Sequence, residues 1–482
     1  MAASAVAALA ADERESAAAG GFLFSPAVAA YVLLSVTLWA NDGMLGPWSA
    51  APFLGCVYLL VDTGRRLRQA DPEPASAVLR PAKWTRYLLL LALLAGARRP
   101  GFYLNPGTPQ WAFTLLVLVL LGAALLGVRH RLTRNQGDAL AVVMLAAAGA
   151  AGVLLLHASP RPRIDVFAVQ QLGAAQLLAG RDPYAVNYPN PYGASESLSF
   201  FGTQVPQLRC YPYPPLSLLV ATAGFWLAQD VRVAFLALQL LTGALLYAMV
   251  RRRSGTTALG LCGLHLLSPR GLFVLEQGWT EPLLMAGIAA WTALVLRWPR
   301  ASRRAQLGQG LVLGLVLAAK QYAVLLLPLF LAPRFRPAWP RAALWRTTGL
   351  AVGISGLGLL PLLLWHPRDL FEDLVLFQMR QPFRPDALTL PALFHFATGL
   401  RAPGALALLG AAASLLWIFP RLPRQPAGLL FGAALCLFGF FALAKQAFCN
   451  YYSLVAVLLL LCAAAAAREE SPSQRPGQDC LG

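Results

Sequence analysis

The sequence alternates between long apolar runs and short polar connections from residue 22 to residue 467. A helix needs about 20 apolar residues to cross a bilayer, and fewer suffice in short or tilted helices. Helices satisfy their backbone hydrogen bonds within one segment, which lipid requires of an open structure. The pattern therefore predicts an all-α polytopic membrane protein with about 12–14 transmembrane helices. The predicted spans are 22–40, 47–62, 84–97, 111–128, 139–157, 231–250, 256–268, 280–298, 307–319, 321–333, 344–365, 403–418, 427–444 and 449–467.

Arginine clusters fill several of the short connections between these spans. Such loops stay on the cytoplasmic side of a membrane by the positive-inside rule. We therefore expect one face of the protein to carry the connections 65–68, 129–134, 251–253, 297–304, 333–341 and 420–424.

Two apolar runs would break this rule if they crossed the membrane in a single pass. If 213–228 crossed, the arginines at 251–253 would lie outside, so we expect 213–228 to stay at the outer face. If 307–333 were one span, the basic loop 333–341 would lie outside. The rule holds if the chain turns at Lys320 and Gln321, which places that lysine at the outer end of the bundle.

Composition supports the membrane assignment and argues against a nucleic-acid-binding protein and against a cysteine metal site. The chain is 58% hydrophobic and 12% charged, with a net charge of +18, and its mean hydropathy is +0.59. The charge follows the loops, as expected for membrane topology, and we expect no nucleic-acid partner. The seven cysteines lie mostly in apolar runs and form no metal-binding spacing.

The spans divide the chain into five predicted regions. Long polar connections at 158–212 and 366–402, and a short one at 269–281, fall on the outer face, where a site would be built. The predicted regions are a cytoplasmic tail (1–21), an N-terminal extension of four spans (22–138), a core (139–333) whose catalytic outer loop is 158–230, a C-terminal module (334–467) with outer loop 366–402, and a second tail (468–482).

Asp165 follows directly after the span 139–157 and is the first candidate for chemistry. Arg161 and Arg163 flank it and would keep it ionised. An ionised carboxylate at the membrane surface is suited to general-base catalysis. The same residue is equally suited to capping the helix that the following residues predict, and the two roles are compatible.

The predicted outer face also carries cations that suit an anionic headgroup. The chain has three lysines, and Lys320 and Lys445 each precede a glutamine within an apolar run. Arg380 and Arg384 lie in the loop 366–402. Arginine binds phosphate through two hydrogen bonds and lysine as a point charge. The alternatives are membrane-anchoring lysines and solvated loop arginines.

Several segments together resemble the GT-C superfamily of membrane glycosyltransferases, and most closely the polyprenyl-phosphate-mannose-dependent mannosyltransferases of glycosyltransferase family 87. They cover roughly residues 139–467, and the four spans before 139 fall outside the resemblance. The segments are the acid after a span (Asp165), GRDPYAVNY, YPYPPLSLL, LEQGWTEPLL, GLVLAAKQYAVLLLPLFL, RQPFRPDALTLPAL and AKQAFCNYY.

The resemblance implies an inverting transferase whose catalytic base is Asp165, on an outer loop with membrane-parallel helices. It implies a polyprenyl-phosphate sugar donor, typically of mannose, and a lipid or glycan acceptor at the extracytoplasmic (periplasmic) face of the plasma (inner) membrane. Donor phosphate would bind Lys320, Lys445, Arg380 and Arg384. The same motifs point to substrate binding by Asp182, Tyr184, Tyr213, Glu276, Gln277, Gln321, Gln446, Asn450 and Tyr451.

The sequence lacks the motifs of several other classes of site. The chain has no glycine-rich phosphate loop, histidine cluster or zinc motif, and no Asp-x-Asp pair for a metal and a nucleotide-sugar. We therefore expect no cofactor and no metal. A transporter or flippase of a lipid-linked sugar is the alternative, because intramembrane charges also mark transport pathways. A non-catalytic scaffold is a third possibility.

Overall fold

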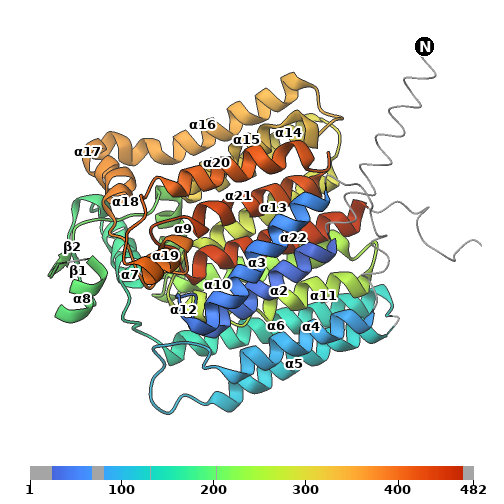
Figure 1. Ribbon diagram of the computed structural model, residues 1–482, viewed down its shortest axis with the longest axis horizontal. Helices are drawn as coiled ribbons and strands as arrows, with labels where there is room; N and C mark the ends of the chain where they lie inside the picture. Colours follow the sequence, from blue (N-terminus) through green and yellow to red (C-terminus); the bar gives the residue numbers. More distant parts are fainter. Residues whose placement is uncertain (1–23, 68–80, 131, 202, 470–482) are drawn as a thin grey trace, which may run out of the picture.

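The computed structural model describes residues 24–67, 81–130, 132–201 and 203–469 as a bundle of helices that run along a common direction (Figure 1). The strands β1 (Tyr188–Pro189) and β2 (Gln207–Leu208) form a short antiparallel ladder. The longer helices are α2 (Phe24–Asn41), α3 (Pro47–Arg66), α4 (Pro81–Ala97), α5 (Gln110–Arg129), α6 (Arg134–Ala158), α7 (Asp165–Leu178), α8 (Ala194–Phe201), α9 (Pro215–Ala228), α10 (Arg232–Val250), α11 (Gly255–Leu266), α13 (Glu281–Arg297), α14 (Arg303–Ala319), α16 (Arg341–Trp365), α19 (Leu390–Thr398), α20 (Leu406–Ile418), α21 (Pro426–Ala442) and α22 (Cys449–Glu469).

Short helical segments connect these helices. They are η2 (Pro183–Ala185), α12 (Gly271–Glu276), η3 (Gln321–Leu326), α15 (Leu327–Leu331), η4 (Pro333–Phe335), α17 (Pro367–Phe371), η5 (Glu372–Leu376), α18 (Phe377–Arg380) and η6 (Phe419–Arg421).

The apolar helices make the chain a polytopic helical membrane protein, as the hydrophobic pattern predicts. Within the described residues, six helices are long and apolar enough to cross a membrane, namely α2, α5, α6, α10, α16 and α22. Shorter apolar helices coincide with other predicted spans, among them α21 and the segment from η3 to α15. The predicted tails 1–21 and 468–482 lie outside the described residues, except for residues 468 and 469, which end α22.

The arginine-rich connections gather at one end of the bundle. Arg251 pairs with Asp138 at 2.5 Å, which joins the loop after α10 to the start of α6. Arg468 donates to the Met249 carbonyl at the end of α10. Arg334 donates to the Phe419 carbonyl and so joins two further basic connections. The other end carries α7, α8, α17 and α18 (Figure 1).

Helix α9 begins and ends at the end opposite the basic loops, as the charge pattern predicts. At its first turn, Ser217 donates to the carbonyl of Ala319, the last residue of α14. Just beyond its last turn, the Gln229 carbonyl accepts a hydrogen bond from Gln171 of α7. A helix with both ends on one side of the bundle does not cross it.

The chain also turns at Lys320, as predicted. Helix α14 ends at Ala319, and Lys320 has extended backbone angles (φ −156°, ψ 142°) before η3 begins. The returning segment reaches the basic end, because Arg334 lies there. A polar residue pair in an apolar run thus marks a real break between two helices.

The four N-terminal helices pack into the rest of the bundle. Helix α2 contacts α22, and α5 contacts α6 and α11. Their buried side chains belong to one hydrophobic core that also includes α13, α21 and α22. The extension predicted at 22–138 is therefore part of the same core. All six cysteines among the described residues are buried, which agrees with their apolar surroundings.

Candidate active site

A cavity of about 1170 Å³ lies at the end of the bundle opposite the basic loops. Its walls come from the loops after α2, α4 and α6, from the segments around α9, η3 and α18, and from the ends of α21 and α22. The predicted site residues that line it are Asp165, Tyr213, Gln277, Lys320, Gln321, Arg384, Lys445, Gln446, Asn450 and Tyr451. Residues spread over nearly 300 positions of sequence thus converge on one space.

Asp165 occupies the first turn of α7, whose N-cap residue is Ile164. The Tyr192 hydroxyl donates to Asp165 Oδ1 at 2.9 Å and accepts the Asp165 backbone N–H at 3.2 Å. The Val166 backbone N–H also donates to Oδ1, at 2.8 Å. These contacts fix the carboxylate at the cavity wall. Asp165 therefore begins the helix without being its cap residue.

Among the charges around Asp165, that of Arg384 acts on its carboxyl, rather than those of the flanking Arg161 and Arg163. Arg163 instead pairs with Glu196 of α8 at 3.0 Å. Burial raises the pKa of the Asp165 carboxyl above its ordinary value, while the hydrogen bond from Tyr192 and the charge of Arg384 oppose that rise. A carboxylate with a raised pKa is a stronger base than an ordinary aspartate.

Lys320 is buried, with 6% of its surface exposed, and is not an anchor at the membrane surface. Its Nζ lies 2.9 Å from Glu281 Oε1 and donates to the Thr280 hydroxyl at 2.7 Å. It also lies 4.9 Å from the Tyr213 ring centre. Glu281 is fully buried and accepts a further hydrogen bond from Tyr322. The sequence-based prediction missed this ion pair, in which Glu281 compensates the lysine charge.

Arg384 and Lys445 differ in how their charges are satisfied. Arg384 makes two hydrogen bonds to Asp386, at 2.8 and 2.6 Å, and its guanidinium lies over the Phe200 ring. Lys445 Nζ donates to the Met379 carbonyl at 2.9 Å. Burial lowers the pKa of Lys445, and no carboxylate pairs with it within the described part of the chain. Lys445 is thus the lysine in the cavity whose charge is best placed to meet an anion.

The polar residues beside the two lysines have separate contacts. Gln321 donates to the Pro212 carbonyl at 2.9 Å and to the Leu374 carbonyl at 3.3 Å, which ties η3 to two outer segments. Gln446 lines the cavity between α21 and α22. Tyr451 packs against Tyr322, with ring centres 5.9 Å apart.

Four predicted site residues lie outside the cavity lining. Asp182 caps η2 and pairs with His366. Tyr184 is buried among other tyrosines and donates to the Tyr213 carbonyl. Both oxygens of Glu276 accept backbone hydrogen bonds within the fold. Arg380 is exposed at the end of α18. The first three serve local structure, and the fourth points no charge into the site.

The cavity lining also contains Tyr192, Phe102 and Tyr103, which are not among the site residues predicted from the sequence. Tyr192 lies in the tyrosine-rich loop, but the sequence did not distinguish it from its buried neighbours. Phe102 and Tyr103 come from the N-terminal extension, for which the resemblance offers no role. A glycine followed by two aromatics between two spans is the available signal, and it is a weak one.

One side of the cavity is apolar and exposed. Val324 of η3, Val375 of η5, Met379 of α18 and Leu408 of α20 line it, and between 41% and 72% of each residue's surface is exposed. Exposed apolar side chains beside a cavity mark a surface for an apolar ligand or for lipid. Lys445 adjoins this apolar side through its hydrogen bond to the Met379 carbonyl, whereas Asp165 and its partner Tyr192 form a polar side of the same cavity.

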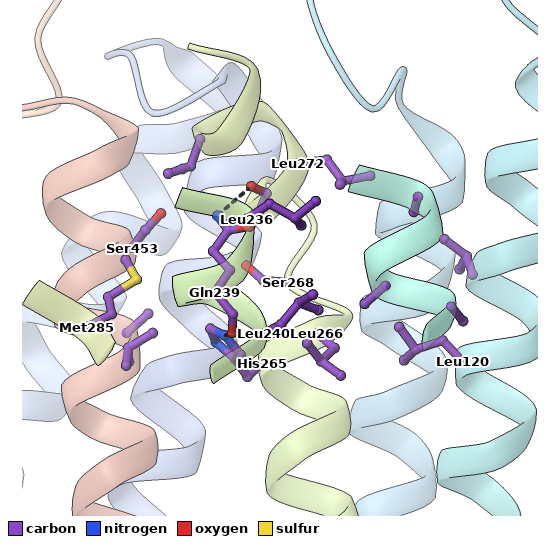
Figure 2. Close-up of a pocket in the computed structure, with 18 of the residues that line it drawn as sticks. Leu120, Leu236, Gln239, Leu240, His265, Leu266, Ser268, Leu272, Met285 and Ser453 are labelled. Carbon is purple, nitrogen blue, oxygen red and sulfur yellow. Dashed lines mark hydrogen bonds between the residues drawn. The ribbon is translucent and has the colours of Figure 1, made fainter. Parts of the chain in front are cut away.

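A second cavity of about 80 Å³ lies between α5, α6, α10 and α11 (Figure 2). Its lining is mainly leucine and alanine. Its polar groups bond within the protein, since Gln239 donates to the Gly271 carbonyl and His265 contacts the Gln239 carbonyl at 3.1 Å. It marks the seam between the N-terminal helices and the remainder of the bundle, and it brings together no catalytic groups.

The described residues contain no group of three or more His, Cys, Asp or Glu side chains that could hold a metal ion. No protein-family model and no curated protein matches the chain. Among solved structures, it is similar to ArnT from Cupriavidus metallidurans bound to undecaprenyl phosphate, with 16% identity and a TM-score of 0.44. The similarity covers 68% of this chain and 59% of that one, so the chain spans less than two thirds of that structure. We therefore base its function on its own residues.

Proposed function

We propose that the protein is a membrane glycosyltransferase that moves a sugar from a polyprenyl-phosphate donor to a lipid or glycan acceptor. The observation that carries the proposal is the large cavity at one end of the bundle. It joins a carboxylate of raised pKa, Asp165, to Lys445, which has no carboxylate partner among the described residues, beside an exposed apolar wall. A polyprenyl phosphate needs both an apolar surface and a cation, and sugar transfer needs a base.

In the proposed reaction, Asp165 takes the proton from the acceptor hydroxyl. The hydroxyl oxygen then attacks the anomeric carbon of the donor sugar and forms the new glycosidic bond. The bond from that carbon to the phosphate oxygen breaks with inversion, and polyprenyl phosphate leaves. Lys445 stabilises the charge that develops on the phosphate, with Arg384 and Lys320 as further cations at the cavity.

The resemblance to family 87 supports mannose as the transferred sugar. The basic loops at the opposite end support a cytoplasmic location for that end and an extracytoplasmic location for the cavity. The proposed location is therefore the plasma (inner) membrane, with the reaction at its periplasmic face. The proposed reaction needs no nucleotide to activate the sugar, because the donor is already activated by its phosphate.

The test is transfer by purified protein in lipid nanodiscs. Radiolabelled polyprenyl-phosphate mannose and a lipid extract of the host are supplied to the wild type and to Asp165→Asn. We expect label in a new lipid or glycan, and a loss of about 10²–10⁴-fold in the variant. Transfer that survives in Asp165→Asn would show that Asp165 is not the catalytic base. Failure with mannose, arabinose and glucose donors alike would favour the transporter or flippase of a lipid-linked sugar.

A further inference from the structure

The N-terminal extension, which lies outside the family resemblance, supplies part of the cavity wall. Asp42 and Met44 follow α2, and Phe102 and Tyr103 follow α4. Hydrogen bonds fix this wall to the C-terminal half: the Leu45 backbone N–H donates to the Asp386 carbonyl at 2.8 Å. Asp42 also pairs with Arg98 and Arg270. The extension is thus positioned to affect what enters the cavity.

Glu276 fixes the backbone of the loop that carries Phe102 and Tyr103. The Phe102 and Tyr103 backbone N–H groups donate to the two carboxylate oxygens, at 2.5 and 2.7 Å. Glu276 has no exposed surface. A Cβ at position 101 would come within 2.5 Å of Glu276 Oε1, so a larger residue there would displace the carboxylate from these hydrogen bonds. Buried, charge-assisted hydrogen bonds of this kind fix a loop before any ligand arrives.

The fixed backbone presents an aromatic surface to the cavity. Phe102 and Tyr103 pack edge to face, with ring centres 5.3 Å apart. Even so, 64% of the Phe102 surface is exposed. Burial raises the pKa of Tyr103, and the charges of Glu276, Glu196 and Asp165 raise it further, so the Tyr103 hydroxyl lies near these acids. The Phe102 ring packs on Tyr103 and therefore lies close to the same acids.

We infer that Phe102 and Tyr103 form a stacking surface for a sugar ring of the acceptor. A pyranose presents polar hydroxyls at its edge and C–H groups on its faces. An aromatic ring covers such a face, while nearby carboxylates and amides accept and donate at the edge. The inference rests on the proposed function and assigns the acceptor to the polar side beside Asp165, and the donor phosphate to Lys445 and the apolar wall. Glu276 becomes a positioning residue for this surface.

Kinetics with the transferase test the assignment through Phe102→Ala and Phe102→Leu. The leucine variant keeps an apolar side chain and removes the ring. We expect both to raise the acceptor KM about tenfold and to change the donor KM much less. The matched control is Trp111→Ala, an equally exposed aromatic of the same extension, 72% exposed and outside the cavity lining. A change in donor KM with an unchanged acceptor KM would overturn the inference.

A binding measurement separates this inference from the proposed function. Saturation-transfer NMR on the full protein in nanodiscs, with methyl α-mannoside and methyl α-glucoside as probes, needs no turnover. We expect transfer to the ring C–H protons of at least one probe in the wild type and in Trp111→Ala, and its loss in Phe102→Ala. Equal signals in wild type and Phe102→Ala, or none in the wild type, would reject the stacking surface. Sugar binding that depends on Phe102 without any transferase activity would instead reject the proposed reaction.

Discussion

At the scale of single residues, the three cations of the cavity have different roles because their partners differ. Lys320 is neutralised by the buried Glu281, and Arg384 by Asp386. In the part of the chain that the structure describes, Lys445 has a carbonyl partner, Met379, and no carboxylate. A cation already paired with a carboxylate gains less from a phosphate than one that lacks such a pair. The sequence presents Lys320 and Lys445 as equivalent, whereas the structure separates them.

Replacing Lys445 with glutamine should weaken donor binding more than replacing an exposed arginine nearby. A hydrogen bond to a charged group contributes about 1.5–3 kcal/mol, so the donor KM should rise roughly 10- to 100-fold. Arg380→Gln should change it by less than about threefold, because exposed charges contribute little. Steady-state kinetics with varied donor concentration measure both. Equal effects of the two variants would contradict the cavity-based assignment.

The pH dependence of transfer should report on Asp165 and its tyrosine partner. Asp165 acts as a base only when it is deprotonated, and its raised pKa moves the acidic fall in activity above the ordinary aspartate range. The Tyr192 hydrogen bond stabilises the ionised form and lowers the pKa. Tyr192→Phe should therefore shift the acidic limb upward by about one pH unit. Tyr58→Phe, at an exposed tyrosine of α3, serves as the control. If the acidic fall in activity does not shift in Tyr192→Phe, that fall does not report the ionisation of Asp165.

At the scale of helices, the ion pair of Lys320 and Glu281 connects the end of α14 to the beginning of α13. The chain must break at Lys320 for η3 to return, and a buried charge at the break requires a partner. The pair therefore stabilises the turn that brings Gln321 and Tyr322 to the cavity.

Lys320→Met should destabilise the protein because it leaves the Glu281 carboxylate buried and unpaired. Loss of one partner of a buried pair costs about 3–5 kcal/mol, which should appear as a large drop in Tm by tryptophan fluorescence. The double variant Lys320→Met/Glu281→Gln removes both charges and should recover much of that loss. If the double variant is as unstable as the single one, the pair does not act as described.

The break at Lys320 and the position of α9 were predictable because charge and apolar length leave few topologies open. The partners of the site residues were not. Glu281 and Lys320 are 39 positions apart, and Asp165 and Tyr192 are 27 apart. Such pairings follow from how helices pack, which periodicity does not specify. Asp182, Tyr184 and Glu276 show the reverse: polar motif residues that the fold uses internally.

At the scale of the whole molecule, the resemblance separates an N-terminal extension from a catalytic core, and the packing joins them. Helix α2 lies against α22, and the loops after α2 and α4 complete the cavity. The sequence predicts these spans correctly as helices. Their contribution to the site was not predictable, because it depends on contacts between the first hundred residues and the segments near residues 276 and 386.

The orientation of the whole bundle yields the last prediction. Basic loops lie at one end and the cavity at the other, so the loop 333–341 should face the cytoplasm and α8 should face outward. On a Cys480→Ser background, the remaining cysteines are buried and should not react. A membrane-impermeant maleimide should then label Ser195→Cys in intact cells, and Ala338→Cys only after permeabilisation, because both positions are exposed. The reverse labelling pattern would place the cavity on the cytoplasmic side and rule out a reaction at the extracytoplasmic face.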